Sequence, residues 1–101
     1  SIEFLELINL FFKDLLIFQK DNQNTNLNFI QLKFYLNDIN LQYPNANWDD
    51  CIILINNAEN YTLKNGLIQL IFIALIIEIQ KILSLKFYNI NFIEDYLNYQ
   101  T

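Results

Sequence analysis

Residues 67–83, LIQLIFIALIIEIQKIL, constrain the fold of the chain more than any other segment. The run carries a single polar side chain, Gln69, before Glu78 interrupts it, and Lys81 follows three residues later. A helix that spans a membrane needs about 20 mostly apolar residues, and a charged side chain near the bilayer centre costs about 2.5–3.5 kcal/mol. The segment is therefore too short for a direct membrane span, and we expect a helix buried inside a protein.

The counts of glycine and proline favour helices over strands. The chain of 101 residues has one Gly and one Pro, whereas an all-β fold needs many tight turns, usually built with Gly, Pro, Asn and Asp. A chain of this length usually forms one domain. The sequence thus predicts a single small all-α domain over residues 1–101, an antiparallel bundle of four to five helices around a central apolar helix at residues 63–87.

The spacing of apolar residues predicts five helices, over residues 2–19, 27–41, 48–58, 63–87 and 92–99. The second of these is ambiguous, because alternate residues from Ile30 to Leu36 are apolar, as in a strand. We favour a helix there, because no partner strand is visible and an isolated strand is not stable.

Polar residues stand where several of these helices are expected to begin. The expected N-caps are Asn26, Asn47 with Asp50, Thr62, and Asn91 with Glu94. In the helix over residues 48–58, the side chains expected to face the core are Trp48, Cys51, Ile52 and Ile55.

The residue types that most catalytic sites use are missing. The chain has no His, no Arg and a single Cys. General acid–base catalysis most often uses His, charge stabilisation often uses Arg, and zinc sites need clusters of Cys and His. Asp38, Asp49 and Asp50 could offer oxygen ligands to a metal, but they lack the spacing of a calcium loop. Asp49 and Asp50 fit the first turn of a helix, where the helix dipole favours negative charge. We expect no enzymatic activity and no cofactor.

The single cysteine indicates a reducing compartment. Cys51 cannot form an intramolecular disulfide, and we expect it to be a buried small hydrophobic residue. At the start of the sequence, Glu3 and Glu6 stand where a signal peptide would carry Lys or Arg. We therefore expect a cytoplasmic protein, with the interior of an organelle as the alternative.

The net charge of −5, from six Lys against eleven Asp and Glu, restricts the class of partner. A nucleic-acid binder needs a basic face to neutralise phosphates, and no window of this sequence is basic. An acidic protein is better matched to a basic protein, because complementary potentials speed their encounter. We expect a protein partner of basic character and no nucleic acid.

Ten residues are candidates for contacts with a partner. Trp is enriched at interface hot spots, although a sole Trp at a helix start more often packs into its own core. Aromatic residues beside acids near the C-terminal end suit a basic partner, with a core position and a hydrated rim as the alternative. Leu10 and Ile17 fall within the polar arc of the first helix, so they are either exposed or meet another chain. The candidates are Trp48, Asp49, Asp50, Tyr88, Glu94, Asp95, Tyr96, Tyr99, Leu10 and Ile17.

Three hypotheses about function follow. The first is a non-enzymatic protein-binding module, most concretely a small acidic inhibitor of the immunity or antitoxin type that masks a basic partner. The second is an accessory structural subunit of an organellar or membrane-associated complex, motivated by the high content of Ile, Leu and Phe. The third is a homo-oligomeric helical scaffold, in which surplus apolar positions such as Leu10 and Ile17 meet a second copy.

Overall fold

The computed structural model describes residues 2–65 and 68–92. Within these residues the chain forms α-helices and one short 3-10 helix, and it contains no strand. The all-α class is thus confirmed for the part of the chain that the structure describes, and helix is confirmed over strand for most of residues 27–41. The elements are α1 (Ile2–Lys20), η1 (Ile30–Leu32), α2 (Lys33–Gln42), α3 (Trp48–Asn65) and α4 (Ile68–Leu83).

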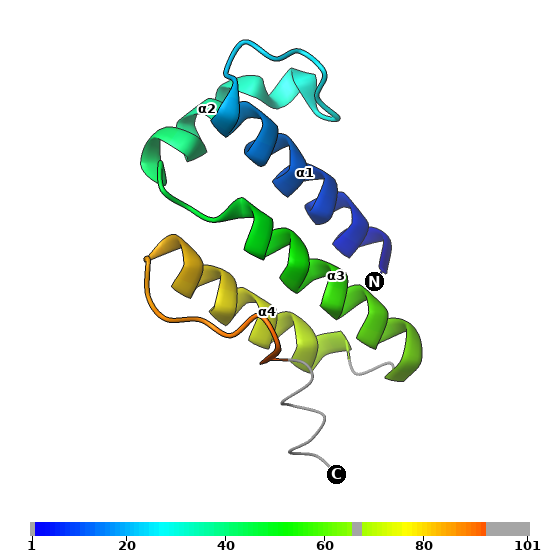
Figure 1. The fold of residues 1–101 in the computed structure, drawn as a ribbon. Helices are drawn as coiled ribbons and strands as arrows, with labels where there is room; N and C mark the ends of the chain where they lie inside the picture. Colours follow the sequence, from blue (N-terminus) through cyan, green and yellow to red (C-terminus); the bar gives the residue numbers. More distant parts are fainter. Residues whose placement is uncertain (1, 66–67, 93–101) are drawn as a thin grey trace.

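The helix in the middle of the fold is α3 (Figure 1). It packs against α1 on one side and against α4 on the other, whereas α2 packs against α1. Helices α1 and α4 run in the same direction, and α3 runs opposite to both (Figure 1). The central position expected for a helix over residues 63–87 is not confirmed, because α4 lies at the edge of this layer.

The boundary between the third and fourth helices is wrong in the prediction. Helix α3 continues to Asn65, so Thr62 lies inside it and not at the start of the next helix. The physical reason is that Ala58 and Tyr61 extend the buried face of α3 beyond residue 58. The polar residues between them look like a loop in the sequence, but within this helix Asn60 is exposed and Glu59 is half-buried.

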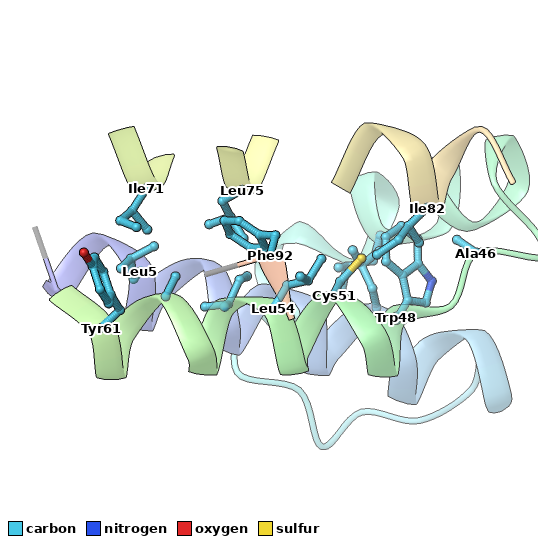
Figure 2. Packing of buried hydrophobic residues seen from close by; sticks show 14 of the residues in the cluster. Leu5, Ala46, Trp48, Cys51, Leu54, Tyr61, Ile71, Leu75, Ile82 and Phe92 are labelled. Atoms are coloured by element: carbon cyan, nitrogen blue, oxygen red, sulfur yellow. The ribbon is translucent and has the colours of Figure 1, made fainter. Parts of the chain in front are cut away.

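The hydrophobic core gathers along the buried side of α3 (Figure 2). Buried α3 residues recur at intervals of three and four, as the period of a helix with one buried stripe requires. Of the four side chains expected to face inward, Ile52 is only half-buried, and the others are confirmed. The buried hydrophobic residues of α3 are Trp48, Cys51, Leu54, Ile55, Ala58 and Tyr61.

The start of α3 is capped as the sequence predicts. The backbone N–H of Asp50 donates to Asn47 Oδ1 at 3.1 Å, which satisfies one of the free donors of the first turn. The return bond differs from a capping box, because Asp50 Oδ2 accepts from the Asn47 side-chain amide at 3.1 Å and not from a backbone N–H. The predicted pair of Asn91 with Glu94, and the helix over residues 92–99, extend outside the described residues.

The loop before η1 is held by a buried carboxylate, Asp14 of α1. Its Oδ1 accepts the backbone N–H of Asn28 at 2.9 Å and the Asn28 side-chain amide at 3.0 Å. Its Oδ2 accepts the backbone N–H of Phe29 at 2.7 Å. The expected cap at Asn26 is therefore wrong, because a residue of another helix performs this role and α2 begins only at Lys33.

Helix α4 ends at Leu83, four residues earlier than expected. The N–H of Lys86 donates to the carbonyl of Lys81 at 2.9 Å, and the N–H of Leu85 donates to Ile82 at 3.1 Å. These two bonds form a Schellman motif, which needs a residue with positive φ after the helix. Leu85 has a φ of 57°, a conformation that usually selects glycine.

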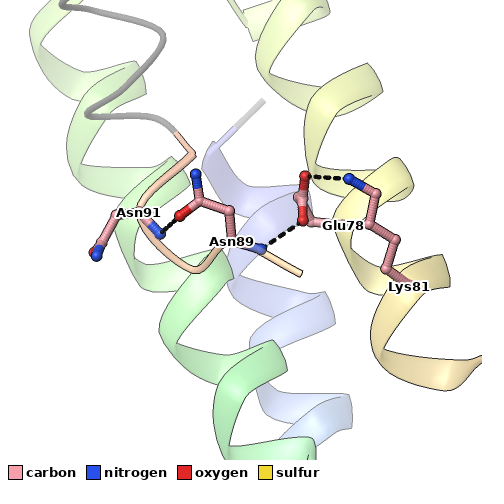
Figure 3. Close-up of polar contacts among 4 residues, drawn as sticks. All are labelled: Glu78, Lys81, Asn89 and Asn91. Atoms are coloured by element: carbon pink, nitrogen blue, oxygen red, sulfur yellow. Dashed lines mark hydrogen bonds and ion pairs between the residues drawn. The ribbon is translucent and has the colours of Figure 1, made fainter. Parts of the chain in front are cut away.

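The segment after α4 returns along α3 and α4, and Glu78 fixes it (Figure 3). Glu78 is buried on α4; its Oε2 accepts the backbone N–H of Asn89 at 2.8 Å, and its Oε1 pairs with Lys81 Nζ at 3.0 Å. On the α3 side, the Asn57 side-chain amide donates to the carbonyl of Ile90 at 3.0 Å. These bonds explain why a charged residue interrupts the apolar run of α4.

Candidate functional site

Helix α4 is apolar on two opposite sides, and the residues that the structure describes cover only one of them. The buried residues of its inner side follow one another at intervals of four, three and four positions, and this side faces α3 and the core. The residues of this inner side are Ile71, Leu75, Glu78 and Ile82. Four aliphatic side chains on the outer side are about half exposed, between 46% and 58%; they are Leu70, Ile73, Ile76 and Ile77.

The exposed apolar surface continues onto the start of α1. The rings of Phe4 and Phe72 lie 5.7 Å apart between centroids, so Phe4 adjoins the flank of α4. Phe4 and Leu7 are each 53% exposed and stand one turn apart on α1. We call this surface the α4 face; its residues are Phe4, Leu7, Leu70, Ile73, Ile76 and Ile77.

Charges lie at the two ends of the α4 face and not within it. No residue of α4 from Ile68 to Ile77 is charged. At the end where α1 and α4 begin (Figure 1), Glu3 is exposed one turn before Leu7. At the opposite end a shallow groove of about 390 Å³ runs from Ile77 to Lys86. The α4 face is therefore an uncharged strip with an acid at one end and lysines at the other.

Exposed apolar residues on α2 do not form a comparable strip. Phe34, Tyr35 and Leu41 are well exposed, but charged side chains interrupt them. Lys33 lies over the Phe34 ring with its Nζ 5.6 Å from the centroid, and Asp38 is exposed on the same helix. Single exposed apolar side chains are normal on protein surfaces, whereas a contiguous patch marks an interaction site.

Trp48 lies in the core and not at the surface, with 1% of its area exposed. Its ring stacks on Phe12 with centroids 5.6 Å apart, and its indole N–H donates to Asn40 Oδ1 at 2.9 Å. The core interpretation of Trp48 thus holds in this structure, because no part of the side chain is available to a partner.

Asp49, Asp50 and Tyr88 come together at the start of α3. The Tyr88 hydroxyl donates to Asp50 Oδ2, and this bond is the main cause that raises the pKa of Tyr88 above its usual value. Asp49 is exposed, whereas Asp50 is half-buried by its bonds to Asn47 and Tyr88. The hydrogen bond fixes the return segment to α3, so Tyr88 and Asp50 have a structural role.

The remaining candidates divide into two groups. Glu94, Asp95, Tyr96 and Tyr99 lie outside the described residues. Leu10 and Ile17 are half-buried on α1, and neither packs against the core. Neither is a residue of the α4 face, and none of the ten candidates belongs to that face.

The α4 face is absent from the sequence-based candidates because the apolar run was expected to be buried all round. A signal for it exists in the sequence. Glu78 stands on the same stripe as Ile71, Leu75 and Ile82, and a second stripe passes through Leu70, Ile73 and Ile77. Two apolar stripes on opposite sides of a helix require two neighbours, and within residues 2–65 and 68–92 only the inner stripe is covered.

Two observations on the described residues concern metal binding and the reactivity of the cysteine. They contain no cluster of three residues from His, Cys, Asp and Glu that could hold a metal. Burial raises the pKa of the Cys51 thiol to about 12, and Asp50 contributes to the rise, so the thiolate nucleophile is not available at neutral pH. The expectation of a buried, hydrophobic Cys51 is confirmed.

A polar seam between α1 and α3 contains one perturbed carboxyl. The Asn9 side-chain amide donates to Asn56 Oδ1 at 2.9 Å. Burial raises the pKa of Glu59, the nearby Glu6 raises it further, and Lys13 opposes the rise. The Glu59 Oε1 atom is buried without a hydrogen-bond partner. This carboxyl lies between two packed helices, beside the Glu6 and Lys13 side chains of α1.

Within the ranges 2–65 and 68–92, no helix is long and apolar enough to cross a bilayer. Comparisons of the chain with models of protein families, with curated proteins and with solved structures found no match. The α4 face is thus the feature from which a function can be inferred.

Proposed function

We propose that the protein is a non-enzymatic protein-binding module that contacts its partner through the α4 face. The observation that carries this proposal is the row of half-exposed aliphatic side chains on α4, with no charge among them. Together with Phe4 and Leu7 they expose on the order of 500 Å² of apolar surface, at the upper end for a monomeric protein. The largest apolar patch of a protein is often functional.

The energy available from the α4 face is of the size that association requires. Complete burial of a large apolar side chain contributes about 1.5–3 kcal/mol. Six side chains that are about half exposed would then contribute about 4–9 kcal/mol. Association costs about 4–15 kcal/mol in lost translational and rotational freedom. The α4 face therefore supports stable binding when the partner buries a similar apolar surface against it.

The most concrete form of this module is a small acidic inhibitor of the immunity or antitoxin type that masks a basic protein. Its support is the net charge of −5 and the exposed Glu3 and Glu6 at the start of α1. Asp14 and Glu78 are buried and accept backbone hydrogen bonds within the fold. They therefore contribute little to the attraction of basic side chains at the surface. Binding to a basic partner should weaken as salt increases.

A second form is an accessory subunit of an organellar or membrane-associated complex. The observation that favours it is that the outer side of α4 is uncharged over residues 68–77, so apolar surroundings suit it. A chain that purifies as a stable monomer without detergent would remove this form and leave the binding module in place.

Replacing Ile73 with Glu should abolish binding through the α4 face and leave the fold intact. Ile73 is 58% exposed, so the new carboxylate is hydrated in the free chain but desolvated in a complex. A buried, unpaired charge costs several kcal/mol, so we expect at least about a hundredfold loss of affinity. Affinity capture from the native cell, compared between the unchanged chain and the I73E variant, measures this loss.

The matched control for I73E is Leu41→Glu on α2, an exposed aliphatic residue outside the α4 face. We expect L41E to capture the same proteins as the unchanged chain. If I73E retains its partners while L41E loses them, the binding surface lies on α2 and the proposal is wrong. Salt titration of the captured complex then separates a basic partner, which salt releases, from an apolar one.

A further inference from the structure

We propose that the partner of the α4 face is a second copy of the same chain, bound through a two-fold symmetric contact with the two α4 helices antiparallel. This proposal rests on the proposed function and names the partner for that surface. In such a contact the same surface of both copies is buried: if one residue of the first copy touches a second residue of the other copy, the reverse contact also forms. The surface must therefore be complementary to itself. The α4 face meets this condition in spacing, charge and area.

The spacing of the exposed side chains fits a helix pair. Leu70, Ile73 and Ile77 follow intervals of three and four residues, which is the pattern of a seam between two packed helices. In helix pairs of this class the axes cross at about 20° and lie about 8–10 Å apart. With Ile73 near the two-fold axis, Leu70 of each copy meets Ile77 of the other. The seam is therefore filled by aliphatic side chains from Leu70 to Ile77, and the next position in the pattern is the polar Gln80.

The charges select the antiparallel arrangement. Glu3 stands at one end of the α4 face, and Lys86 lines the groove at the other end. An antiparallel pair places the acidic end of each copy near the basic end of the other, whereas a parallel pair places like charges together. The helix dipoles also oppose each other favourably only in the antiparallel pair.

The same charges favour a second copy over a uniformly basic partner. Lys86 is exposed, and Lys81 lines the same groove although its Nζ also pairs with Glu78. A basic protein laid along the α4 face would meet repulsion at this end. A second copy brings charges of both signs in the required order. The net charge of −5 on each copy opposes association only at long range, where salt screens it.

The area of the surface is consistent with a dimer of modest size. A standard stable interface buries about 800 Å² on each partner. The six apolar side chains of the α4 face supply on the order of 500 Å², and the polar rim from Gln69, Gln80 and the groove beyond Ile77 adds to it. An interface at the low end of this size class forms a weak, concentration-dependent complex.

Sedimentation equilibrium of the full chain from low to high micromolar concentrations tests the proposal. We expect the unchanged chain to sediment as a dimer at the upper end and to dissociate on dilution. The I73E variant should weaken dimerisation by at least about a hundredfold and sediment as a monomer, with an unchanged circular dichroism spectrum. The L41E control should sediment as the unchanged chain does. If I73E does not fold, Ile77→Gln should weaken the dimer in the same direction.

Cysteine cross-linking tests the orientation. One chain carries Leu70→Cys, a second chain with a different tag carries Ile77→Cys, and a mild oxidant is added to the mixture. An antiparallel pair gives mainly the mixed disulfide, because these positions face each other and disulfides need a Cα separation of about 4.4–6.8 Å. Mainly self-linked Leu70→Cys dimers would overturn the antiparallel arrangement. The buried Cys51 should not react.

The outcomes distinguish this inference from the proposed function. A chain that stays monomeric at all concentrations overturns the dimer. If the monomeric chain captures a different protein and the I73E variant does not, the α4 face is still a binding surface. In that case only the identity of the partner proposed here is wrong. If I73E changes neither sedimentation nor capture, both proposals fail. A dimer that L41E disrupts and I73E does not would place the contact on α2 and overturn the inference.

Discussion

Replacing Leu54 with Ala is expected to lower the free energy of unfolding by about 3 kcal/mol. Leu54 has no exposed surface and lies on α3, the helix that packs against both α1 and α4 (Figure 2). Removal of buried methyl and methylene groups loses their transfer energy and leaves a cavity that the surroundings fill only partly. A cavity on α3 weakens both of its helix contacts at once, so we expect a value within the usual range for a buried leucine.

The neighbouring Ile53 provides the control for this substitution. It stands on the same helix but is 40% exposed, so Ile53→Ala should cost less than about 1 kcal/mol. Urea unfolding followed by circular dichroism measures both variants. Similar costs for Leu54→Ala and Ile53→Ala would contradict the position of α3 in the core. Unfolding should be measured at a fixed chain concentration, because association would add to the apparent stability.

Replacing Asp14 with Ala is expected to cost about 2–4 kcal/mol. The carboxylate is fully buried and accepts the backbone N–H groups of Asn28 and Phe29. Without it these donors lose their partner where the segment packs on α1, and each unsatisfied donor costs about 1–3 kcal/mol. The loop before η1 loses its anchor as well, so the ordering of η1 and α2 against α1 should weaken.

The control for Asp14 is Asp21, a residue of the same type that is exposed. Asp21 Oδ1 accepts only the local N–H of Gln23, at 3.0 Å, so Asp21→Ala should cost less than about 1 kcal/mol. Amide hydrogen exchange adds a local measurement, because Asn28 and Phe29 should exchange faster in Asp14→Ala. Equal stability of the two variants would show that the buried carboxylate does not hold the loop.

The features of the fold that depend on local spacing could be predicted from the sequence. The start of α3 follows from Asn47 and the two acids after it, and the length of α1 follows from its apolar stripe. The end of α3 could not be predicted, because Tyr61 stands alone among polar residues and only its contact with the core reveals the stripe. The cap by Asp14 also depends on a contact between distant residues.

The candidate site shows the same limit. The apolar content of residues 67–83 is visible at once, but its distribution over two sides matters only when the number of neighbouring helices is known. Trp48 has the residue type of an interface anchor, yet its contacts with Phe12 and Asn40 place it in the core. Residue type left both roles open for Trp48, with the core favoured, whereas packing identified the outer side of α4 as exposed.

The protection of a cysteine placed at residue 73 tests the central claim, that a protein covers the outer side of α4, most directly. Cys51 is buried with a pKa of about 12, so Ile73→Cys provides the reactive thiol, and Leu41→Cys provides the exposed reference. At high chain concentration, we expect a maleimide to label Ile73→Cys at least about tenfold more slowly than Leu41→Cys, and dilution to remove the difference. Equal labelling rates at every concentration would contradict the proposed α4 contact.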